Sequence, residues 1–342
     1  RETGIGAWSL PAFVRAMREG VSRDGHRLYP AFPYPSFTLM SDDDLLALYA
    51  YLMALPPVRA QAPTTQLAFP YGARSLMGLW NALYVAPGPY VADPARSAQW
   101  NRGAYLVEGA GHCGACHTPR GALGAEDRGG RYLAGAFVEG WEAPSLVGGG
   151  AGPVPWTEAQ LYAYLREGSS REHGAAVGPM AEVVGALRAL PDADIAAMAH
   201  YLASLGPGLD DAEAAALAQR AVDASRARDA TMRDGAQRMF EASCGGCHHD
   251  GAHPAIHGAN LPLALNSSLH SAHPDNLVRV ILEGVATPAE GVGGMPAFAD
   301  SLSDDQIARL AAYMRQRFAP GAPAWAEVVA AVKRVRLAAA RP

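Results

Sequence analysis

Two short segments contain all four cysteines of the chain, and in each segment a histidine follows the second cysteine directly. The segments read Cys113-Gly-Ala-Cys116-His117 and Cys244-Gly-Gly-Cys247-His248. Two thiols at this spacing, with histidine next, are the attachment signature of c-type haem. The thiols form thioethers with the haem vinyl groups, and the histidine ligates the iron. The sequence therefore predicts two covalent haems c, tethered by Cys113, Cys116, Cys244 and Cys247 and ligated by His117 and His248.

Other uses of paired cysteines fit this pattern less well. A thioredoxin-like redox pair is expected in a βαβ context, whereas the residues around both pairs have helical spacing. A four-cysteine zinc site places its pairs roughly 15–20 residues apart, but these two pairs lie in distant parts of the chain. Haem attachment is therefore the favoured interpretation.

The composition is that of a globular protein. The chain has 342 residues, 49% of them hydrophobic, and a net charge of −5, and this length allows two or three domains. An acidic chain without a long basic block argues against nucleic acid as a partner. No apolar run reaches the roughly 18 residues of a membrane-spanning helix, so any membrane association is expected to be peripheral. The opening Arg1-Glu2-Thr3-Gly4 is interpreted as a processed or truncated start.

One helix-like segment occurs three times in the chain. Each copy begins with a capping signal, continues with apolar residues at helical spacing and ends in tyrosine followed by leucine or methionine. The copies span residues 41–52, 191–202 and 303–314. A second helical element precedes each copy, at residues 8–20, 156–168 and 274–284. This self-similarity indicates three related units.

A third element, a short helix that runs into a haem motif, precedes only two of the units. Residues 103–108 and 235–241 combine glycine with an aromatic residue, and we expect each helix to pack closely on the last helix of its unit. The predicted fold class is all-α, with tandem cytochrome c-type domains of which the first is incomplete at its N-terminus. The predicted divisions are 1–57 (C-terminal part of domain 1), 58–97 (linker), 98–206 (domain 2), 207–231 (linker helix), 232–320 (domain 3) and 321–342 (C-terminal tail).

Methionine is the expected sixth iron ligand, because histidine and methionine together leave no open position on the iron. Met180 and Met295 stand in glycine-flanked loops just before the last helix of their units, and we predict that they are the ligands; the alternative is a flexible core methionine. In the first unit Met40 is the nearest candidate, although it aligns with the core position Leu302. A third haem is expected if the upstream part of domain 1 is present.

Residues near the motifs are expected to support the haems. A backbone carbonyl near Pro119 is expected to hold the second ring nitrogen of His117. Trp141 and Trp156 are predicted to line the haem edge of domain 2, and His173 is interpreted as a hydrogen-bonded structural residue or a surface group.

Two further features have open interpretations. The histidines after the second motif are interpreted as surface or propionate-facing groups, with a second metal site as the weaker alternative: His249, His253 and His257. The apolar stretch 76–86 is either a helix packed on the core or a patch that faces a partner or a membrane.

Almost the whole sequence resembles the trihaem cytochrome c subunits of periplasmic, membrane-associated dehydrogenases. The segments that carry this resemblance are Thr3-Gly-Ile-Gly-Ala-Trp-Ser9, Leu28-Tyr-Pro-Ala-Phe-Pro-Tyr34, Trp100-Asn-Arg-Gly-Ala-Tyr-Leu-Val-Glu-Gly109 and Gly111-His-Cys-Gly-Ala-Cys-His-Thr-Pro-Arg120. Within that family, Val154-Pro-Trp156-Thr and His173-Gly-Ala-Ala-Val-Gly-Pro-Met180 are most similar to the cytochromes of molybdenum hydroxylases of the aldehyde and isoquinoline type. The chain departs from the family in lacking the first C-x-x-C-H motif.

The resemblance implies a non-catalytic electron-transfer subunit, periplasmic and peripheral to the inner membrane. Its partners would be a molybdopterin-type catalytic subunit and an iron–sulfur subunit that oxidise an aldehyde or an N-heterocycle, with ubiquinone or the respiratory chain as acceptor. Cytochrome subunits of pyrroloquinoline-quinone alcohol dehydrogenases or flavin gluconate and sorbitol dehydrogenases are the first alternative. A free periplasmic shuttle is another. A dihaem peroxidase would need an open iron position, which Met180 and Met295 argue against.

Overall fold

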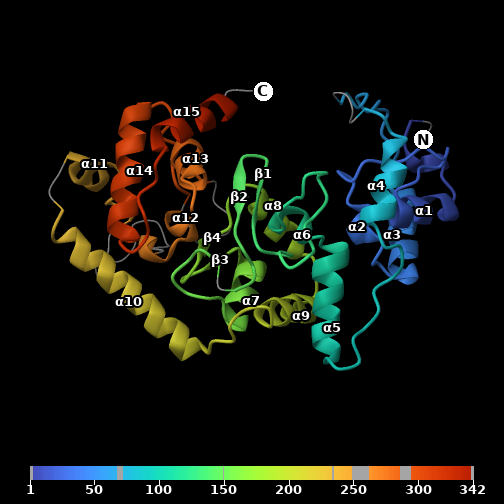
Figure 1. Ribbon diagram of the computed structural model, residues 1–342, viewed down its shortest axis with the longest axis horizontal. Helices are drawn as coiled ribbons and strands as arrows, with labels where there is room; N and C mark the ends of the chain where they lie inside the picture. The colour runs from blue at the N-terminus through green and yellow to red at the C-terminus, as the bar shows by residue number, and fades with distance from the viewer. Residues whose placement is uncertain are drawn as a thin grey trace. The chain divides into compact units, whose positions relative to one another are not determined.

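The computed structural model describes residues 3–67, 72–148, 150–232, 235–248, 262–285 and 294–339. Its contacts divide the chain into two compact units. The N-terminal unit comprises Arg1–Ala115 with Ala122–Ala125, and the C-terminal unit comprises Cys116–Gly121 with Glu126–Pro342. The described residues are mostly helical, as predicted (Figure 1). They also form two two-stranded antiparallel sheets, which the all-α prediction did not include.

The N-terminal unit is built from short helices around a small core. Its helices are η1 (Ile5–Ala7), α1 (Leu10–Glu19), α2 (Tyr34–Phe37), α3 (Asp42–Ala54), α4 (Leu76–Tyr84), α5 (Ala98–Ala104) and the π-helical η2 (Tyr105–Ala110). The side chain of Ser9 caps α1 by accepting from Ala12 N–H, and Ser41 caps α3 in the same way. Phe13, Met17 and Leu45 lie in the core between these helices.

The polar residue Asn81 of helix α4 is buried and faces the rest of the N-terminal unit. The hydroxyl of Tyr34 donates to Asn81 Oδ1 (2.5 Å), and Asn81 Nδ2 donates to the carbonyl of Glu19 (3.0 Å). The opposite face presents Leu76, Leu79 and Leu83, whose side chains are exposed. Asn81 thus anchors α4 while its leucines remain outside the core. A partner or a membrane on this face stays a prediction.

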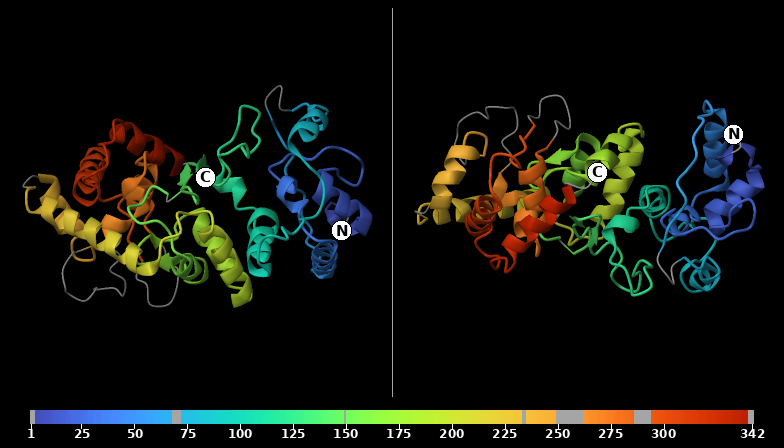
Figure 2. Two further views of the ribbon diagram at one scale, coloured as in Figure 1. Left: turned by 60° about the horizontal axis from the view of Figure 1, so that its bottom comes forward. Right: turned by 90° about the horizontal axis from the view of Figure 1, so that it is seen from above.

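The C-terminal unit holds the other two copies of the repeated helix, at residues 191–202 and 303–314 (Figures 1 and 2). The first motif ends with α6 (Gly114–His117), which crosses the boundary between the units. The following elements are β1 (Ala136–Val138), β2 (Trp141–Ala143), α7 (Glu158–Glu167), β3 (Ser169–Ser170), β4 (Gly174–Ala175), α8 (Pro179–Leu187), α9 (Asp192–Ala203), α10 (Asp211–Asp229), α11 (Gly235–Ser243), η3 (Leu263–Leu265), α12 (Ser267–His270), α13 (Asp275–Glu283), α14 (Asp304–Phe318) and α15 (Val328–Ala339).

The β1–β2 hairpin closes with a two-residue turn. Val138 pairs with Trp141 in antiparallel register, and the two residues between them, Glu139 and Gly140, have φ values of +51° and +79°. Positive φ at both positions is the type I′ geometry, whose twist suits a tight hairpin. The hairpin therefore has a local cause, although it is only three residues long on each side.

The last repeat packs as its sequence predicts. Helix α11 contacts α14, where Phe240 lies 5.6 Å from Tyr313 and 5.5 Å from Phe318 between ring centroids. Helix α14 begins with a capping box made by Ser303 and Gln306. The aromatic residue of this motif helix is thus buried against the last helix, as expected. The same expectation is wrong for residues 103–108, because Tyr105 lies in the N-terminal unit and its hydroxyl donates to Asp44 of α3.

Residues 321–342, predicted only as a tail, include helix α15, which packs on α13 and α14. Val332 and Val335 are buried in the same core as α14. Arg334 forms an ion pair with Asp275 (2.7 Å), and Arg336 forms one with Asp304 (2.6 Å). This segment therefore belongs to the fold of the last repeat. No helix among the described ranges is both long and apolar enough to cross a membrane.

Candidate haem sites

His117 is held in the protonation state that an iron ligand needs. Its Nδ1 lies 2.7 Å from the carbonyl oxygen of Pro144. A carbonyl can only accept, so Nδ1 carries the hydrogen and Nε2 keeps its lone pair. Burial also lowers the pKa of His117, which favours the neutral ring. A ligand histidine that donates its other N–H to a carbonyl is the usual arrangement at metal sites.

A backbone carbonyl was correctly predicted as the partner of the His117 ring, but the residue that supplies it was not. The sequence suggested a carbonyl near Pro119, but the carbonyl of Pro119 accepts from Asp127 N–H (2.8 Å). The loop of residues 118–135 returns to the histidine at its end. Gly135 N–H donates to the His117 carbonyl (2.7 Å), and Leu133 N–H donates to the hydroxyl oxygen of buried Thr118 (3.0 Å). The segment that follows then brings the carbonyl of Pro144 to the imidazole.

The second motif forms a helical turn that continues from α11. Cys244 N–H donates to the Phe240 carbonyl (2.8 Å), and His248 N–H donates to the Cys244 carbonyl (2.8 Å). Both cysteines and the histidine therefore lie within about one turn. Burial lowers the pKa of His248. Burial, with a smaller effect of Cys247, raises the pKa of the Cys244 thiol to about 11. His249, His253 and His257 lie outside the described residues.

None of the four cysteines forms a disulfide in the part of the chain that the structure describes, and the two pairs share one exposure pattern. In each pair the first cysteine is half-buried and the second is exposed. Among the described residues, no group of three or more His, Cys, Asp and Glu side chains is placed to hold a metal ion. A pair of cysteine thiols next to a neutral imidazole fits the chemistry of haem c, which needs two thiols to form thioethers and one imidazole to bind iron.

The predicted sixth ligands differ in their surroundings. Met180 was predicted in a loop, but it is half-buried in the first turn of α8, which begins at Pro179. Met295 is half-buried where it pairs with Val285. Met40 is 7% exposed and packs against Phe13 and Leu45 in the core of the N-terminal unit. Met198 and Met314, which lie within the repeated helix segments, are buried in the core at 2% and 5% exposed. Iron ligation by Met180 and Met295 stays a prediction.

His173 is a hydrogen-bonded structural residue, which was the first of its two predicted roles. Its ring stacks on Trp156 at 3.4 Å between centroids and 13° between planes. Its Nε2 lies 3.0 Å from Gln160 Oε1, and burial lowers its pKa to about 3. The imidazole is therefore neutral and fixed. Trp156, predicted at the haem edge, is the platform on which this histidine stacks.

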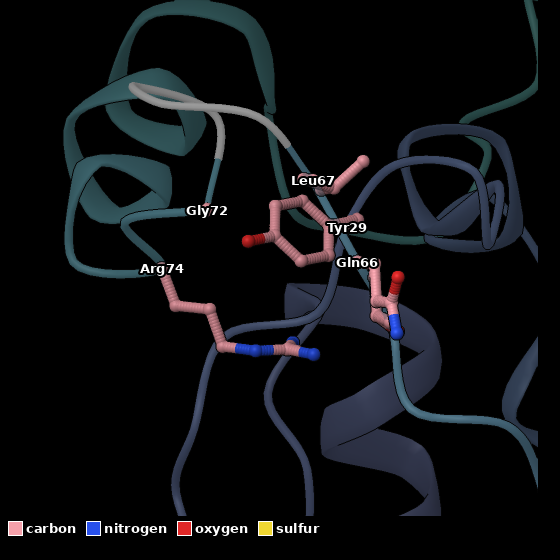
Figure 3. A pocket seen from close by; sticks show the side chains of 6 residues that line it. Tyr29, Gln66, Leu67, Gly72 and Arg74 are labelled. Atoms are coloured by element: carbon pink, nitrogen blue, oxygen red, sulfur yellow. The ribbon is translucent and has the colours of Figure 1, made fainter.

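A pocket in the N-terminal unit contains none of the predicted haem ligands (Figure 3). Tyr29, Gln66, Leu67 and Arg74 line it, and the Arg74 guanidinium lies 4.6 Å from the centroid of the Tyr29 ring. Arg74 also donates to the carbonyl of Arg27 (2.8 Å). The arginine is held by these contacts, and the pocket offers neither a thiol nor an imidazole for a haem.

Comparisons with known proteins agree with the chemistry of the motifs. The cytochrome c family profile matches residues 101–206, and the profile described as cytochrome C oxidase, cbb3-type, subunit III matches residues 230–314. The chain is 38% identical to the fructose dehydrogenase cytochrome subunit of Gluconobacter japonicus, over 92% of this chain and 69% of that protein. The chain belongs to the family of multihaem cytochrome c subunits of dehydrogenases.

Two other relatives show the range of this family. The chain is 52% identical to a nicotinate dehydrogenase subunit of Pseudomonas putida over 98% of its own length, but it spans only 28% of that relative. It is 34% identical to the cytochrome c subunit of the quinone alcohol dehydrogenase of Gluconobacter oxydans, over 94% of this chain and 70% of that subunit. Each matched family range contains one of the two C-x-x-C-H motifs.

Proposed function

We propose that this chain carries electrons for a dehydrogenase complex through c-type haems and does not itself act on substrate. The observation that carries this proposal is the His117–Pro144 contact, which gives the first motif a neutral imidazole with a free Nε2. The cysteine pairs would tether the haems, and His117 and His248 would bind the irons. When bound, a haem supplies reversible one-electron exchange.

Met180 and Met295 are proposed to occupy the sixth positions. Both side chains are half-buried in segments that lead to the last helix of their repeats, and methionine ligation would leave the iron no place for substrate. Electrons must then come from another protein. Met40 is not part of this proposal, because its side chain is 7% exposed within the core of the N-terminal unit.

The catalytic partner is proposed to be of the molybdopterin type, with an iron–sulfur subunit, and to oxidise an N-heterocycle or an aldehyde. Two observations favour it: the 52% identity to the nicotinate dehydrogenase subunit, and the resemblance of residues 154–157 and 173–180 to cytochromes of that class. The second candidate is a cytochrome subunit of a quinone or flavin dehydrogenase, which the 38% and 34% relatives favour.

We further propose a periplasmic location at the inner membrane, with ubiquinone or another respiratory component as acceptor. The outward face of α4, with Leu76, Leu79 and Leu83 exposed, offers an apolar surface for peripheral contact with lipid or with the complex. Nucleic acid stays an unfavoured partner at a net charge of −5.

Substrate-driven haem reduction tests the proposed partner. We expect nicotinate or an aldehyde to reduce the haems of the cytochrome when its dehydrogenase subunits are present, and a ubiquinone analogue to reoxidise them. The control is the purified cytochrome alone, which should stay oxidised with every substrate. Reduction of the cytochrome alone would contradict the non-catalytic role. Reduction by fructose, gluconate or an alcohol in the native complex would favour the second candidate.

A further inference from the structure

Trp141, the first residue of β2, packs against the turn that leads to Met180. A Cβ built on Gly178 would come within 2.5 Å of two atoms of the Trp141 indole. Gly178 also has a φ of +54°, so both its conformation and the close indole require glycine. Because Gly178 stands two residues before Met180, the indole fixes the start of the segment that carries this methionine.

Arg279 of α13, in the third repeat, makes a cation–π contact with the same indole. Its guanidinium lies 5.2 Å from the Trp141 ring centroid, and Nη1 donates to Glu283 Oε1 (2.8 Å). Its Nη2 occupies the space over Gly140, where a Cβ would meet it at 2.7 Å. The arginine side chain is only 11% exposed, and a cation–π contact is stronger when water is excluded.

The next residue of the hairpin is tied to the same helix. Glu142 N–H donates to Asn276 Oδ1 and Asn276 Nδ2 donates to the Glu142 carbonyl, both at 2.8 Å. The hydroxyl of Ser271 donates to the Glu142 carboxylate. The amide of Asn276 thus pairs with β2 as a neighbouring strand would. This pairing fixes the position of Trp141 relative to α13.

The same contacts continue to the other predicted methionine ligand. Glu283, the partner of Arg279, is the last residue of α13. Two residues later Val285 exchanges two backbone hydrogen bonds with Met295, each 2.9 Å long. Contacts between side chains, together with the short chain segment from Glu283 to Val285, therefore connect the Met180 turn to Met295. The residues involved are Gly178, Trp141, Arg279, Glu283, Val285 and Met295.

We propose that Trp141 and Arg279 are positioning residues that couple the two sixth-ligand segments. Trp141 holds the Gly178–Met180 turn, and Arg279 holds Trp141 from α13, so a change at α13 alters the methionine ligation of the haem at the first motif. This inference rests on the proposed ligation by Met180 and Met295. It adds that the methionine ligation at the first motif depends on a residue of the other repeat.

The test uses the full chain with Cys244→Ser and Cys247→Ser, so that haem is attached only at the first motif. Two signals are recorded: the near-infrared methionine–iron band of the oxidised protein, and the rate of carbon monoxide binding to the reduced protein. We expect Trp141→Ala and Arg279→Gln to weaken the band and to speed carbon monoxide binding by about tenfold, the effect of a modest loss of ligand stabilisation. Trp141→Phe, which keeps a ring on Gly178, should restore most of the band.

Arg309→Gln is the matched control. Arg309 forms an i,i+4 ion pair with Asp305 (3.3 Å) on an exposed face of α14, as Arg279 does with Glu283 on α13, and it should change neither signal. If Met180→Ala abolishes the band while Trp141→Ala and Arg279→Gln both leave it intact and leave carbon monoxide binding at the unsubstituted rate, the coupling is wrong but the ligation stands. If Met180→Ala leaves the band intact, the ligand assignment fails and this inference fails with it.

Discussion

Helices α3 and α14 derive from the same repeated sequence, yet their tyrosines have opposite surroundings. Tyr313 of α14 is 2% exposed, whereas Tyr51, at the matching position of α3, is 63% exposed. Tyr201 of α9 is also buried, at 3% exposed. On α14 the tyrosine is covered by Phe240 of the motif helix α11, at 5.6 Å. On α14 the tyrosine is thus buried where the haem-motif helix α11 packs on it.

The contrast extends along the helix. Leu45 is the buried residue of α3, and Leu46 is 50% exposed, whereas the matching Ala308 of α14 is 5% exposed. This face of α3 is therefore exposed where the matching face of α14 is buried. The third haem expected with an upstream part of domain 1 stays a prediction.

Truncation of the covering aromatic residue should have the largest effect. Phe240→Ala removes a fully buried ring from the α11–α14 contact and should lower the free energy of unfolding by about 3–5 kcal/mol. Tyr51→Ala should change it by less than about 0.5 kcal/mol in the same chain, because its side chain is exposed. Denaturant unfolding measures both. An equally large loss for Tyr51→Ala would show that α3 is already covered.

Methionine substitutions should distinguish a core methionine of the first unit from the proposed iron ligand of the last one. Met40→Ala in the N-terminal core should cost about 2–5 kcal/mol of stability and leave the near-infrared band unchanged. Met295→Ala should remove part of that band, lower the potential of one haem and let it bind carbon monoxide. A potentiometric titration with spectra measures these effects. If Met40→Ala removed part of the band, Met40 would be a ligand after all.

Acid should destabilise the C-terminal unit through His173. Its pKa is about 3 in the folded chain and near 6.5 in unfolded protein. Between these values the unfolded state binds a proton that the folded state does not, so this contribution to stability is present above pH ~6.5 and is lost as pH falls towards ~3. His173→Phe keeps a ring on Trp156 but cannot titrate, so the variant should lose less stability over this range.

Acid unfolding followed by circular dichroism measures this difference. Equal acid sensitivity of His173→Phe and the unsubstituted protein would contradict the buried, neutral assignment of His173.

Local sequence signals predicted the repeated helices but not the parts that join them. The caps at Ser41 and Ser303 and the spacing of apolar residues are encoded within one or two turns, and both helices form as expected. The carbonyl that holds His117 comes from Pro144, in a segment far along the chain, and no local pattern indicates such a contact. The β1–β2 turn is formed by glutamate and glycine, which are a weaker hairpin signal than Asn-Gly or Asp-Gly.

The positioning contacts could not be predicted for the same reason. Trp141 was predicted at a haem edge from its residue type, whereas its contact with Arg279 depends on how α13 meets the hairpin. The helix within residues 321–342 was not predicted either. The alternation of small and basic residues there resembles a solvated segment, whereas Val332 and Val335 are buried in the core.

The most direct test of the central claim is the number of haems that remain on the chain after denaturation. We expect a pyridine haemochrome assay on the denatured, purified chain to give two haems per polypeptide, one for each C-x-x-C-H motif. Cys113→Ser with Cys116→Ser should remove one haem, and Cys244→Ser with Cys247→Ser should remove the other. Loss of all haem on denaturation, or zinc bound to the cysteines in its place, would contradict the account.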